Sequence, residues 1–598
     1  MRMLLLRLLL PVLIIGFATG LAACGGDDDD GETQGGFAPP TAAPEDAQTG
    51  GSLEVLAAAD VDYIDPGAAY YQFSYMIDFA TQRPLFSWPP PVTRTPQPDL
   101  AAQPGEITNG GKKVTVQIKE GVEFSPPVDR EATSEDVKYA IERGLMPGVA
   151  NGYVEAYMGD LEGFDEALEA SNEEKTIAPE IAGIETPDKQ TIVFNLERAV
   201  AASFVQALSL PLSAPVPEEY AKEFDAESPS TYGDHQVATG PYMIENNADG
   251  ELTGYSPGKE IKLVRNPNWD EATDYRPAYL DEITVTEGFT NVAAASRKIL
   301  QGESQVNGDI LPEPAELKQA SQDYPDQLTL TPSGGNRYVA LNTTIPPFDD
   351  INVRKAVLAA ADRQAMQLAR GGQLIGPIAT HFIPPTIPGF EEAGGQAGPG
   401  VDFLEKPTGD PKLAEDYFRK AGYESGKYEG DEELLMVAEN AGVDKRVGEV
   451  ALDLFEGLGF NVSFRQVSSD VMYSRFCNRV DAEVAICPNV GWLKDFNDPL
   501  SILDPTFNGE SIVPVNNSNW PQLDVPEINK AMDEAALITD PEERAQAWGE
   551  IDQMVTEQAP AIPYVWDNQP NIRSANVAGV INRFNATWDL SFTSIAAE

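Results

Sequence analysis

The amino-acid sequence predicts a mixed α/β protein with two or three lobes. Its 598 residues exceed what a single hydrophobic core usually supports, so more than one lobe is expected. Hydrophobic residues make up 42% of the chain, which is enough to bury a core in each lobe. Segments with strand periodicity interleave with segments that carry helix-start signals, and this alternation predicts sheets packed against helices.

Strand signals recur along the chain. Residues 113–119 alternate polar and apolar side chains, which predicts a half-buried strand. Short runs rich in β-branched and aromatic residues predict further strands. They lie at residues 191–194, 261–264, 283–285, 338–341 and 462–464.

Three helix starts carry capping signals. Thr133, with Asp136 three residues later, resembles a capping box, and apolar residues follow at helical spacing. Asp410 and Asp540 each precede a proline, which places a carboxylate at the N-cap and proline at the first helical position. Each should therefore open a helix, and Gly422 is expected to close the helix that follows Asp410.

The charge balance argues against two kinds of partner. The chain has 95 Asp and Glu residues against 41 Lys and Arg residues, a formal net charge of −54. This charge would repel a nucleic acid or an anionic membrane surface, and no basic stripe offsets it locally. The excess acid belongs to the folded part of the chain, where it predicts a well-solvated surface.

The first 24 residues predict export and lipidation. Arg2 and Arg7 precede an apolar run at residues 8–21, and small residues lead to Cys24. This is the order of a signal peptide, and it resembles a bacterial lipobox, whose cysteine is acylated and becomes the first residue. The alternative is an ordinary signal, or a single membrane anchor with a chance cysteine. No later segment has the ~20 apolar residues of a membrane-spanning helix, so the remaining chain is expected outside the cytoplasmic membrane, anchored by its lipid.

Residues 25–51 predict a disordered acidic tether. They contain seven acidic residues and no basic residue, with repeated Gly, Pro, Thr and Ala. Such a composition cannot bury enough apolar surface to fold by itself. The tether would link the lipid at Cys24 to a folded body that begins at residue 52.

Two cysteines follow the lipobox. Cys477 and Cys487 are close in the sequence of a chain that is expected to be exported. A local disulfide is expected because oxidising compartments permit it. The alternative is a pair of buried free thiols.

The sequence lacks the residues of common exported hydrolases. Its two histidines, His235 and His381, are isolated, and there is no His-Glu-x-x-His zinc motif. No Gly-x-Ser-x-Gly elbow occurs, and a Ser-His-Asp triad could draw on those two histidines alone. We therefore expect a protein that is not an enzyme and has no metal or cofactor, with an exported hydrolase as the competing class.

Seven short segments, in one order, cover the chain from about residue 52 to 570. The most specific joins the strand at residues 114–124 to the helix at residues 133–143. The others lie at residues 62–66, 239–242, 264–269, 340–363, 410–423 and 491–499. Together they resemble the bacterial extracellular solute-binding proteins of family 5, the oligopeptide- and dipeptide-binding receptors of ABC importers.

The resemblance implies a three-lobed clamshell of the periplasmic-binding-protein type (type II, cluster C) with a discontinuous first lobe. Lobe I would comprise residues 52–85, 208–333 and 565–598, lobe II residues 86–207, and lobe III residues 334–564. Ligand binding would close the lobes, and an ABC permease would recognise the closed form. The implied partners are a peptide or other small solute, the permease subunits, and the membrane through the N-terminal lipid. Nothing in the sequence predicts an oligomer, so a monomer is expected.

The resemblance also implies candidate ligand-binding residues. In relatives that bind peptides, an Asp shortly after a Trp accepts the free ammonium group of the ligand, and Asp495 after Trp492 has that position. A charge-assisted hydrogen bond in a closed, low-dielectric cleft would orient the ligand. Trp492 is expected to form a wall of the cleft, and Tyr70 and Tyr71 are expected to face it. The alternative for Asp495 is a loop or N-cap carboxylate, and the neighbouring Lys494 could neutralise it.

The resemblance leaves more than one function open. The main hypothesis is a receptor that delivers peptides to an ABC permease. Relatives with this fold also carry sugars, metal chelates or haem, so another solute is the alternative within the fold. A surface sensor or adhesin without uptake is the alternative from a different class.

Overall fold

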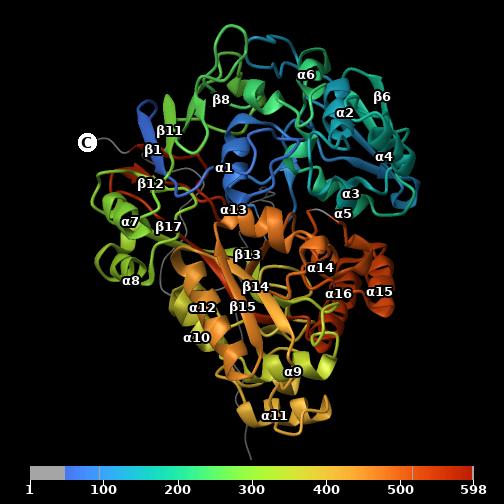
Figure 1. Cartoon of the computed structure of the whole chain (residues 1–598). Coiled ribbons are helices and arrows are strands. Elements are labelled where there is room, and N and C mark those ends of the chain that lie inside the picture. The colour runs from blue at the N-terminus through green and yellow to red at the C-terminus, as the bar shows by residue number, and fades with distance from the viewer. Residues whose placement is uncertain (1–46, 93, 515, 596–598) are drawn as a thin grey trace, which may run out of the picture.

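The computed structural model describes residues 47–92, 94–514 and 516–595, and within these ranges three sheets have four or more strands. We call them the first, second and third sheets, in the order in which the chain enters them. In Figure 1, β1, β8, β11 and β12 of the first sheet lie at the upper left, β6 of the second at the upper right, and β13, β14 and β15 of the third in the lower half. Helices surround all three sheets. The predicted mixed α/β class is confirmed.

The first sheet combines segments that are far apart in the sequence. β1 pairs in parallel with β11 and β12, whereas β10 pairs antiparallel with β8, β9 and β11. One hydrophobic cluster of this region contains Met76 of α1 (Gln72–Thr81) and Trp588 from the last segment of the chain. Helices α7 (Val292–Leu300) and α8 (Pro314–Asp323) lie beside the sheet. The strands are β1 (Ser52–Leu56), β8 (Tyr242–Ile244), β9 (Tyr255–Ser256), β10 (Glu260–Arg265), β11 (Glu282–Thr286) and β12 (Val306–Asn307).

The second sheet is antiparallel throughout, in the order β4-β5-β7-β6. α2 (Ser134–Arg143) packs beside it and begins at the predicted capping box, in which the backbone N–H of Thr133 donates to Asp136 at 2.8 Å. The strands are β4 (Glu106–Thr108), β5 (Lys113–Gln117), β6 (Ile184–Asp188) and β7 (Thr191–Asn195). The other helices of this region are α3 (Val154–Met158), α4 (Phe164–Glu173), α5 (Ala201–Ala207) and α6 (Glu218–Asp225).

The third sheet is mixed, in the order β15-β14-β16-β13-β17. β14 pairs in parallel with β15 and β16, and β13 pairs antiparallel with β16 and β17. The strands are β13 (Leu328–Leu341), β14 (Glu433–Glu439), β15 (Asn461–Val467), β16 (Ile486–Leu493) and β17 (Ala561–Ile572). The helices are α9 (Ile351–Ala360), α10 (Arg363–Arg370), α11 (Pro411–Lys420), α12 (Gly442–Gly457), α13 (Ser469–Val471), α14 (Leu500–Phe507), α15 (Pro526–Ala536) and α16 (Pro541–Glu557).

Two long strands connect the first and third sheets. β13 and β17 pair with each other from Leu328 opposite Ile572 to Ala340 opposite Ala561. At one end of this ribbon, the backbone N–H of Ile572 donates to the side chain of Asn307 in β12 at 2.8 Å. At the other end, β13 also pairs with β16 inside the third sheet. The ribbon therefore crosses from one sheet to the other.

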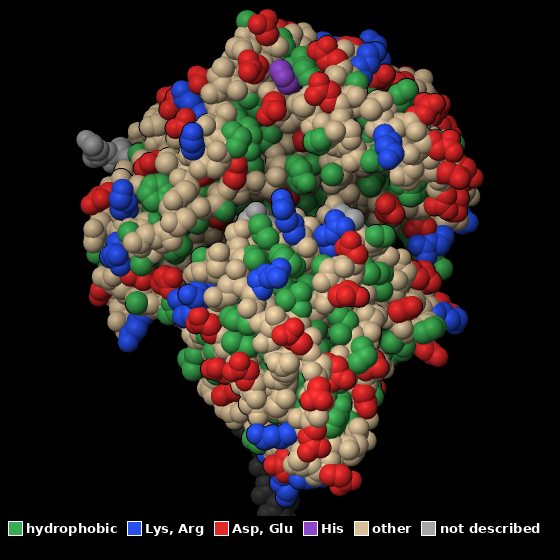
Figure 2. Space-filling view, in the orientation of Figure 1, with side chains coloured by type: hydrophobic (Ala, Val, Ile, Leu, Met, Phe, Trp, Pro, Cys, Tyr) green, Lys and Arg blue, Asp and Glu red, His purple; other side chains and the backbone are tan. Residues whose placement is uncertain are grey.

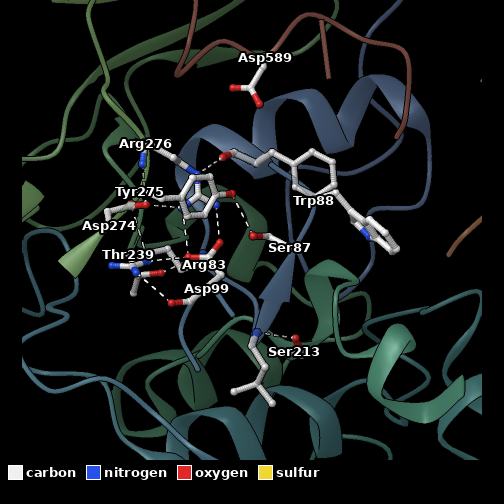
Figure 3. A network of polar contacts seen from close by, with 12 residues as sticks. Arg83, Ser87, Trp88, Asp99, Ser213, Thr239, Asp274, Tyr275, Arg276 and Asp589 are labelled. Atoms are coloured by element: carbon white, nitrogen blue, oxygen red, sulfur yellow. Dashed lines mark hydrogen bonds and ion pairs between the residues drawn. The ribbon is translucent and has the colours of Figure 1, made fainter. Parts of the chain in front are cut away.

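Buried ion pairs join the first and second sheet regions. Figure 3 shows Arg276 beside Asp99 and Asp274, and Asp99 also accepts from Arg83 at 2.9 Å. These four side chains are at most 3% exposed. Because breaking a buried pair leaves an uncompensated charge, such a network holds its elements together firmly.

A second buried network has Arg143 at its centre. Its guanidinium makes two hydrogen bonds to Asp65 and two to Asp225, all between 2.7 and 2.9 Å. Arg143 ends α2, and its ring contact is with Tyr232, 4.8 Å from the guanidinium carbon to the ring centroid. Asp65 follows β1, so this network also ties the second sheet region to the first.

Every strand and helix start predicted from the sequence is present. The six predicted strand segments lie within or overlap β5, β7, β10, β11, β13 and β15. Asp410 and Asp540 are the N-caps of α11 and α16, and both side chains accept backbone N–H groups. Gly422 follows the C-cap of α11 with a φ of +98°, a conformation that favours glycine. Strands β1, β14, β16 and β17 were not predicted from the sequence.

The predicted signal peptide and Cys24 lie outside the described residues. Of the predicted tether, the structure describes residues 47–51. Gly50 donates its N–H to the carbonyl of Tyr279 at 2.7 Å, and Gly51 donates to the side chain of Asp281 at 3.1 Å. The last residues of the predicted tether therefore already belong to the folded body. In the described part of the chain, no helix combines the length and the apolar character needed to cross a bilayer.

Candidate functional site

Asp495 lies where the three sheet regions meet. It follows β16 of the third sheet, and the residue is 7% exposed. The hydroxyl of Tyr70, at the start of α1 in the first sheet region, donates to its Oδ2 atom at 3.1 Å. The hydroxyl of Tyr157, in α3 of the second sheet region, donates to the same oxygen. One carboxylate thus receives hydrogen bonds from both other regions.

Aromatic rings surround this carboxylate. The ring of Tyr70 lies 4.9 Å from that of Tyr153 and 6.3 Å, edge to face, from that of Trp492. Tyr157 meets Phe496 edge to face at 5.0 Å. Trp492 is half-buried, and its indole N–H donates to the carbonyl of Ser501 at 2.8 Å. We call these five rings, Tyr70, Tyr153, Tyr157, Trp492 and Phe496, the aromatic wall.

Burial sets the electrostatics of the site. It raises the pKa of Asp495 to about 7, against the opposing effect of the hydrogen bonds from Tyr157 and Tyr70. Within the described residues, no Lys, Arg or His lies within ion-pair distance of this carboxylate. A cation delivered beside it would lower its pKa and gain a partner in a medium of low dielectric constant.

Lys494 does not pair with Asp495. Burial lowers the pKa of Lys494 to about 7, and its ammonium group lies 4.6 Å from the centroid of the Phe584 ring. Its side chain packs against Gly334, where a Cβ atom would lie 2.7 Å from the lysine Cδ. The two neighbouring side chains therefore point to different surroundings, and neutralisation of Asp495 by Lys494 is not observed.

The loop that carries Asp495 is held at both ends. The backbone N–H of Lys494 donates to the carbonyl of Gly334 at 3.2 Å. Beyond the site, Arg544 of α16 donates to both oxygens of Asp498, at 2.7 and 2.8 Å. The carboxylate of Asp495 is thus carried on a segment fixed to the third sheet.

Of the four candidate ligand-binding residues, the structure brings three together. Tyr70 contacts both Asp495 and Trp492, whereas Tyr71 is 40% exposed and its ring lies 6.2 Å from that of Tyr473. Tyr473 belongs to the third sheet region, so Tyr71 also faces across to it. Tyr153 and Tyr157 were not predicted as site residues because no short sequence motif contains them. Tyr157, for example, is 338 residues away from Asp495 in the sequence.

The two cysteines and His381 make contacts within the fold rather than at the site around Asp495. Cys477 and Cys487 form a disulfide that joins β16 to the helical turn at Met472–Cys477. His381 is fully buried and contacts Asp552 at 2.7 Å and the carbonyl of Gly395 at 3.1 Å. Within the ranges that the structure describes, no group of three or more His, Cys, Asp or Glu side chains could hold a metal ion.

Comparisons with known proteins show the family and the fold. Residues 95–512 match the family described as "Bacterial extracellular solute-binding proteins, family 5 Middle". The "Di/tripeptide-binding protein 3" of Pseudomonas aeruginosa is 23% identical over 467 residues, which cover 77% of this chain and 80% of that protein. "Heme-binding protein A" of Haemophilus influenzae is 25% identical over 470 residues, 77% of each chain. The solved structure of "Clavulanic acid biosynthesis oligopeptide binding protein 2" superposes with a TM-score of 0.78 at 26% identity, over 94% of this chain and 98% of the other.

Proposed function

Because the chain belongs to the bacterial extracellular solute-binding proteins of family 5, we propose that it is the substrate-binding protein of an ABC importer that captures peptides by their free ammonium group. The carrying observation is Asp495, a buried carboxylate without a cationic partner among the described residues, enclosed by the aromatic wall. The similarity to proteins named for di- and tripeptide or oligopeptide binding supports peptides as the solute.

Binding would place the ammonium group of the ligand on Asp495. A carboxylate offers about four acceptor positions, and Tyr70 and Tyr157 both donate to Oδ2. The ammonium can therefore add to the tyrosine hydroxyls or replace one of them. In either arrangement it gains a charge-assisted hydrogen bond in a site that largely excludes water. The aromatic wall would enclose the adjoining part of the ligand.

Opening of the cleft would separate the third sheet region from the other two. In this proposal, lobes I, II and III would be built around the first, second and third sheets. The networks of Arg143 and of Arg276 join the first two regions by buried ion pairs, whereas the ribbon β13–β17 connects the first and third. This difference supports a rigid pair of lobes against which lobe III moves.

Delivery to a permease and anchoring at the membrane complete the proposal. Acylation at Cys24 would hold the protein at the outer face of the cytoplasmic membrane, and residues 25–46 would give it reach. No catalytic step is part of this function. The protein is proposed to act as a monomer.

Calorimetric titration tests the function directly. The exported protein would be unfolded and refolded to remove any carried-over ligand and titrated with di- to pentapeptides, each in a free-amine and an N-acetylated form. Binding of the free-amine set with at least about tenfold weaker binding of the acetylated set is expected, since the charge-assisted bond is lost. If a folded preparation bound neither set, the peptide function would be wrong, and sugars, metal chelates and haem would be titrated next.

A further inference from the structure

A cavity lies beside the aromatic wall, between the second and third sheet regions. It is bounded by α3 and α5 on one side and by α14 and α15 on the other, and these helices face each other at the right of Figure 1. The space between these walls, including the part that is open to solvent, is about 490 Å³. Figure 2 shows the surface hollowed between the upper and lower halves of the molecule.

The cavity adjoins Asp495 through two shared rings. Tyr157 and Phe496 both line it. The hydroxyl of Tyr157 is bonded to Asp495, and Phe496 is the next residue in the chain. Tyr157 and Phe496 thus lie between the cavity and Asp495. The ligand group that would enter the cavity is a side chain near the amino end of a peptide whose ammonium group is held at Asp495.

The walls of the cavity carry more negative than positive charge. Asp160, Asp504 and Asp533 line it together with one cation, Arg198. The guanidinium of Arg198 is already shared: it donates two hydrogen bonds to Asp160, and a third, at 3.1 Å, to Asp533. Its bonds reach from the second sheet region to α15 across the cavity.

Asp504 is left without a cation. Its carboxylate accepts hydrogen bonds from Asn508 at 2.8 Å and Ser511 at 3.3 Å, and no Lys or Arg of the described residues lies within ion-pair distance. Burial raises the pKa of Asp504, the hydrogen bonds from Asn508 and Ser511 oppose this rise, and the charges of Asp533 and Arg198 make smaller contributions of opposite sign. A positive group placed beside Asp504 would stabilise its charged form against both burial and the repulsion from Asp533.

Apolar side chains complete the lining. Val200 and Phe204 contribute from the second sheet region, and Leu500, Met532 and Ala536 from the third. A cavity lined by apolar side chains and by the carboxylate of Asp504 suits a side chain with a methylene stem and a cationic head, because such side chains bury the stem and keep the charge in a polar environment.

We propose that this cavity is a specificity pocket for a basic side chain, so that the preferred ligands are short peptides with Lys or Arg near a free amino end. The stem would lie along Phe204, Leu500 and Met532, and the head would pair with Asp504. The inference rests on the proposed function, since it presumes that Asp495 anchors the ligand ammonium.

Three tripeptides that differ only in their first side chain distinguish the effect of its charge from the effect of its length. Lys-Ala-Ala carries the stem and the charge, norleucine-Ala-Ala carries a similar stem without the charge, and Glu-Ala-Ala carries the opposite charge. Titrated into the full-length mature protein, Lys-Ala-Ala should bind at least about tenfold more tightly than norleucine-Ala-Ala, with Glu-Ala-Ala weakest. In Asp504→Asn, the ratio of the norleucine and lysine dissociation constants should fall to about one.

A second variant tests the role of the cavity's size while keeping its charged residues unchanged. Ala536→Leu narrows the cavity, and it should weaken Lys-Ala-Ala more than Gly-Ala-Ala. Circular dichroism of both variants checks that they are folded. Equal affinities for the lysine and norleucine peptides in the wild type, or an unchanged ratio in a folded Asp504→Asn, would overturn the pocket while leaving the peptide function intact. If none of the tripeptides bound, both proposals would fail together.

Discussion

Tyr157 donates its hydroxyl hydrogen bond to the carboxylate of Asp495 across 338 residues of sequence and between two different sheets. A closed arrangement of the molecule thus satisfies part of the acceptor capacity of the proposed ligand anchor. An arriving ammonium group offers a charge where the tyrosine offers a dipole, so the ligand adds electrostatic stabilisation that Tyr157 cannot supply.

Asp495→Asn should raise the dissociation constant for free-amine peptides by about tenfold to a hundredfold, because it removes the charge from the anchor while keeping its size. Tyr157→Phe is the matched control: it removes one neutral donor, so its effect should be several-fold smaller. Isothermal titration calorimetry with the same peptide measures both. An Asp495→Asn protein with wild-type affinity would remove Asp495 from the site.

Peptide affinity should fall on acidification. The pKa of Asp495 is raised to about 7, chiefly by burial, and a bound ammonium group lowers it. Binding therefore releases a proton below pH 7, and the dissociation constant should rise roughly 20-fold between pH 7.5 and 5.5. Titrations across this range test the prediction, with Asp495→Asn as a control that should show a flatter profile. A flat profile in the wild type would contradict it.

Asp495→Asn should stabilise the ligand-free protein at alkaline pH. A carboxyl group with a raised pKa takes up a proton on folding between about pH 4 and 7, so the free energy of unfolding falls as pH rises through that window. Above pH 7 the buried carboxylate is charged, and the loss in the free energy of unfolding reaches its full size. The Asn side chain carries no charge, so the variant does not suffer this loss. We expect a melting temperature about 1–4 °C higher than wild type at pH 8 and no difference near pH 4. Calorimetric scans of both proteins without ligand make the comparison.

Arg143→Met should destabilise the protein by about 3–5 kcal/mol, because it leaves the buried carboxylates of Asp65 and Asp225 without their cation. Arg419 provides a control: it is about half-exposed and pairs with Glu415 and Asp416 on the surface of α11. Arg419→Ala should change the free energy of unfolding by less than about 1 kcal/mol. Similar losses in the two variants would show that the buried network is not what joins these regions.

The double variant Cys477→Ser/Cys487→Ser should lower the free energy of unfolding by about 2–3 kcal/mol, since it reopens a loop of ten residues in the unfolded chain. Urea denaturation of the oxidised and mutant proteins gives the difference. Alkylation of both cysteines in the folded, unreduced protein would instead indicate free thiols.

The parts of the fold that the sequence predicted are those with local causes. Asp410 and Asp540 cap their helices through side-chain bonds two or three residues away, which a short motif records. β17 contains Pro563 and Pro570, residues that usually argue against a strand, and only its neighbours in the assembled sheet make it one.

The site residues that belong to a sequence motif were predicted, and those that depend on the packing of distant segments were not. A sequence motif singled out Asp495 and Trp492, and the family resemblance drew attention to Tyr70. No motif marks Tyr153 or Tyr157, because their roles arise from lobe packing that brings α3 against the loop after β16. The acidic cavity is a product of the same contact, so its residues carried no signal in the sequence.

The ribbon of β13 and β17 has a mechanical consequence. Two strands bonded along their length bend readily out of their common plane but resist sliding past each other. Within the ribbon, the pairing shifts register between Pro332 and Gly335, where Gly334 has a φ of +67°, and again between Arg337 and Tyr338, and such irregularities bend a strand locally. In the proposed closure, rotation of the third sheet region would therefore be confined largely to one axis that passes near these irregularities. A membrane partner that touches both regions would sense a single angle, and hence occupancy, whichever ligand caused the closure.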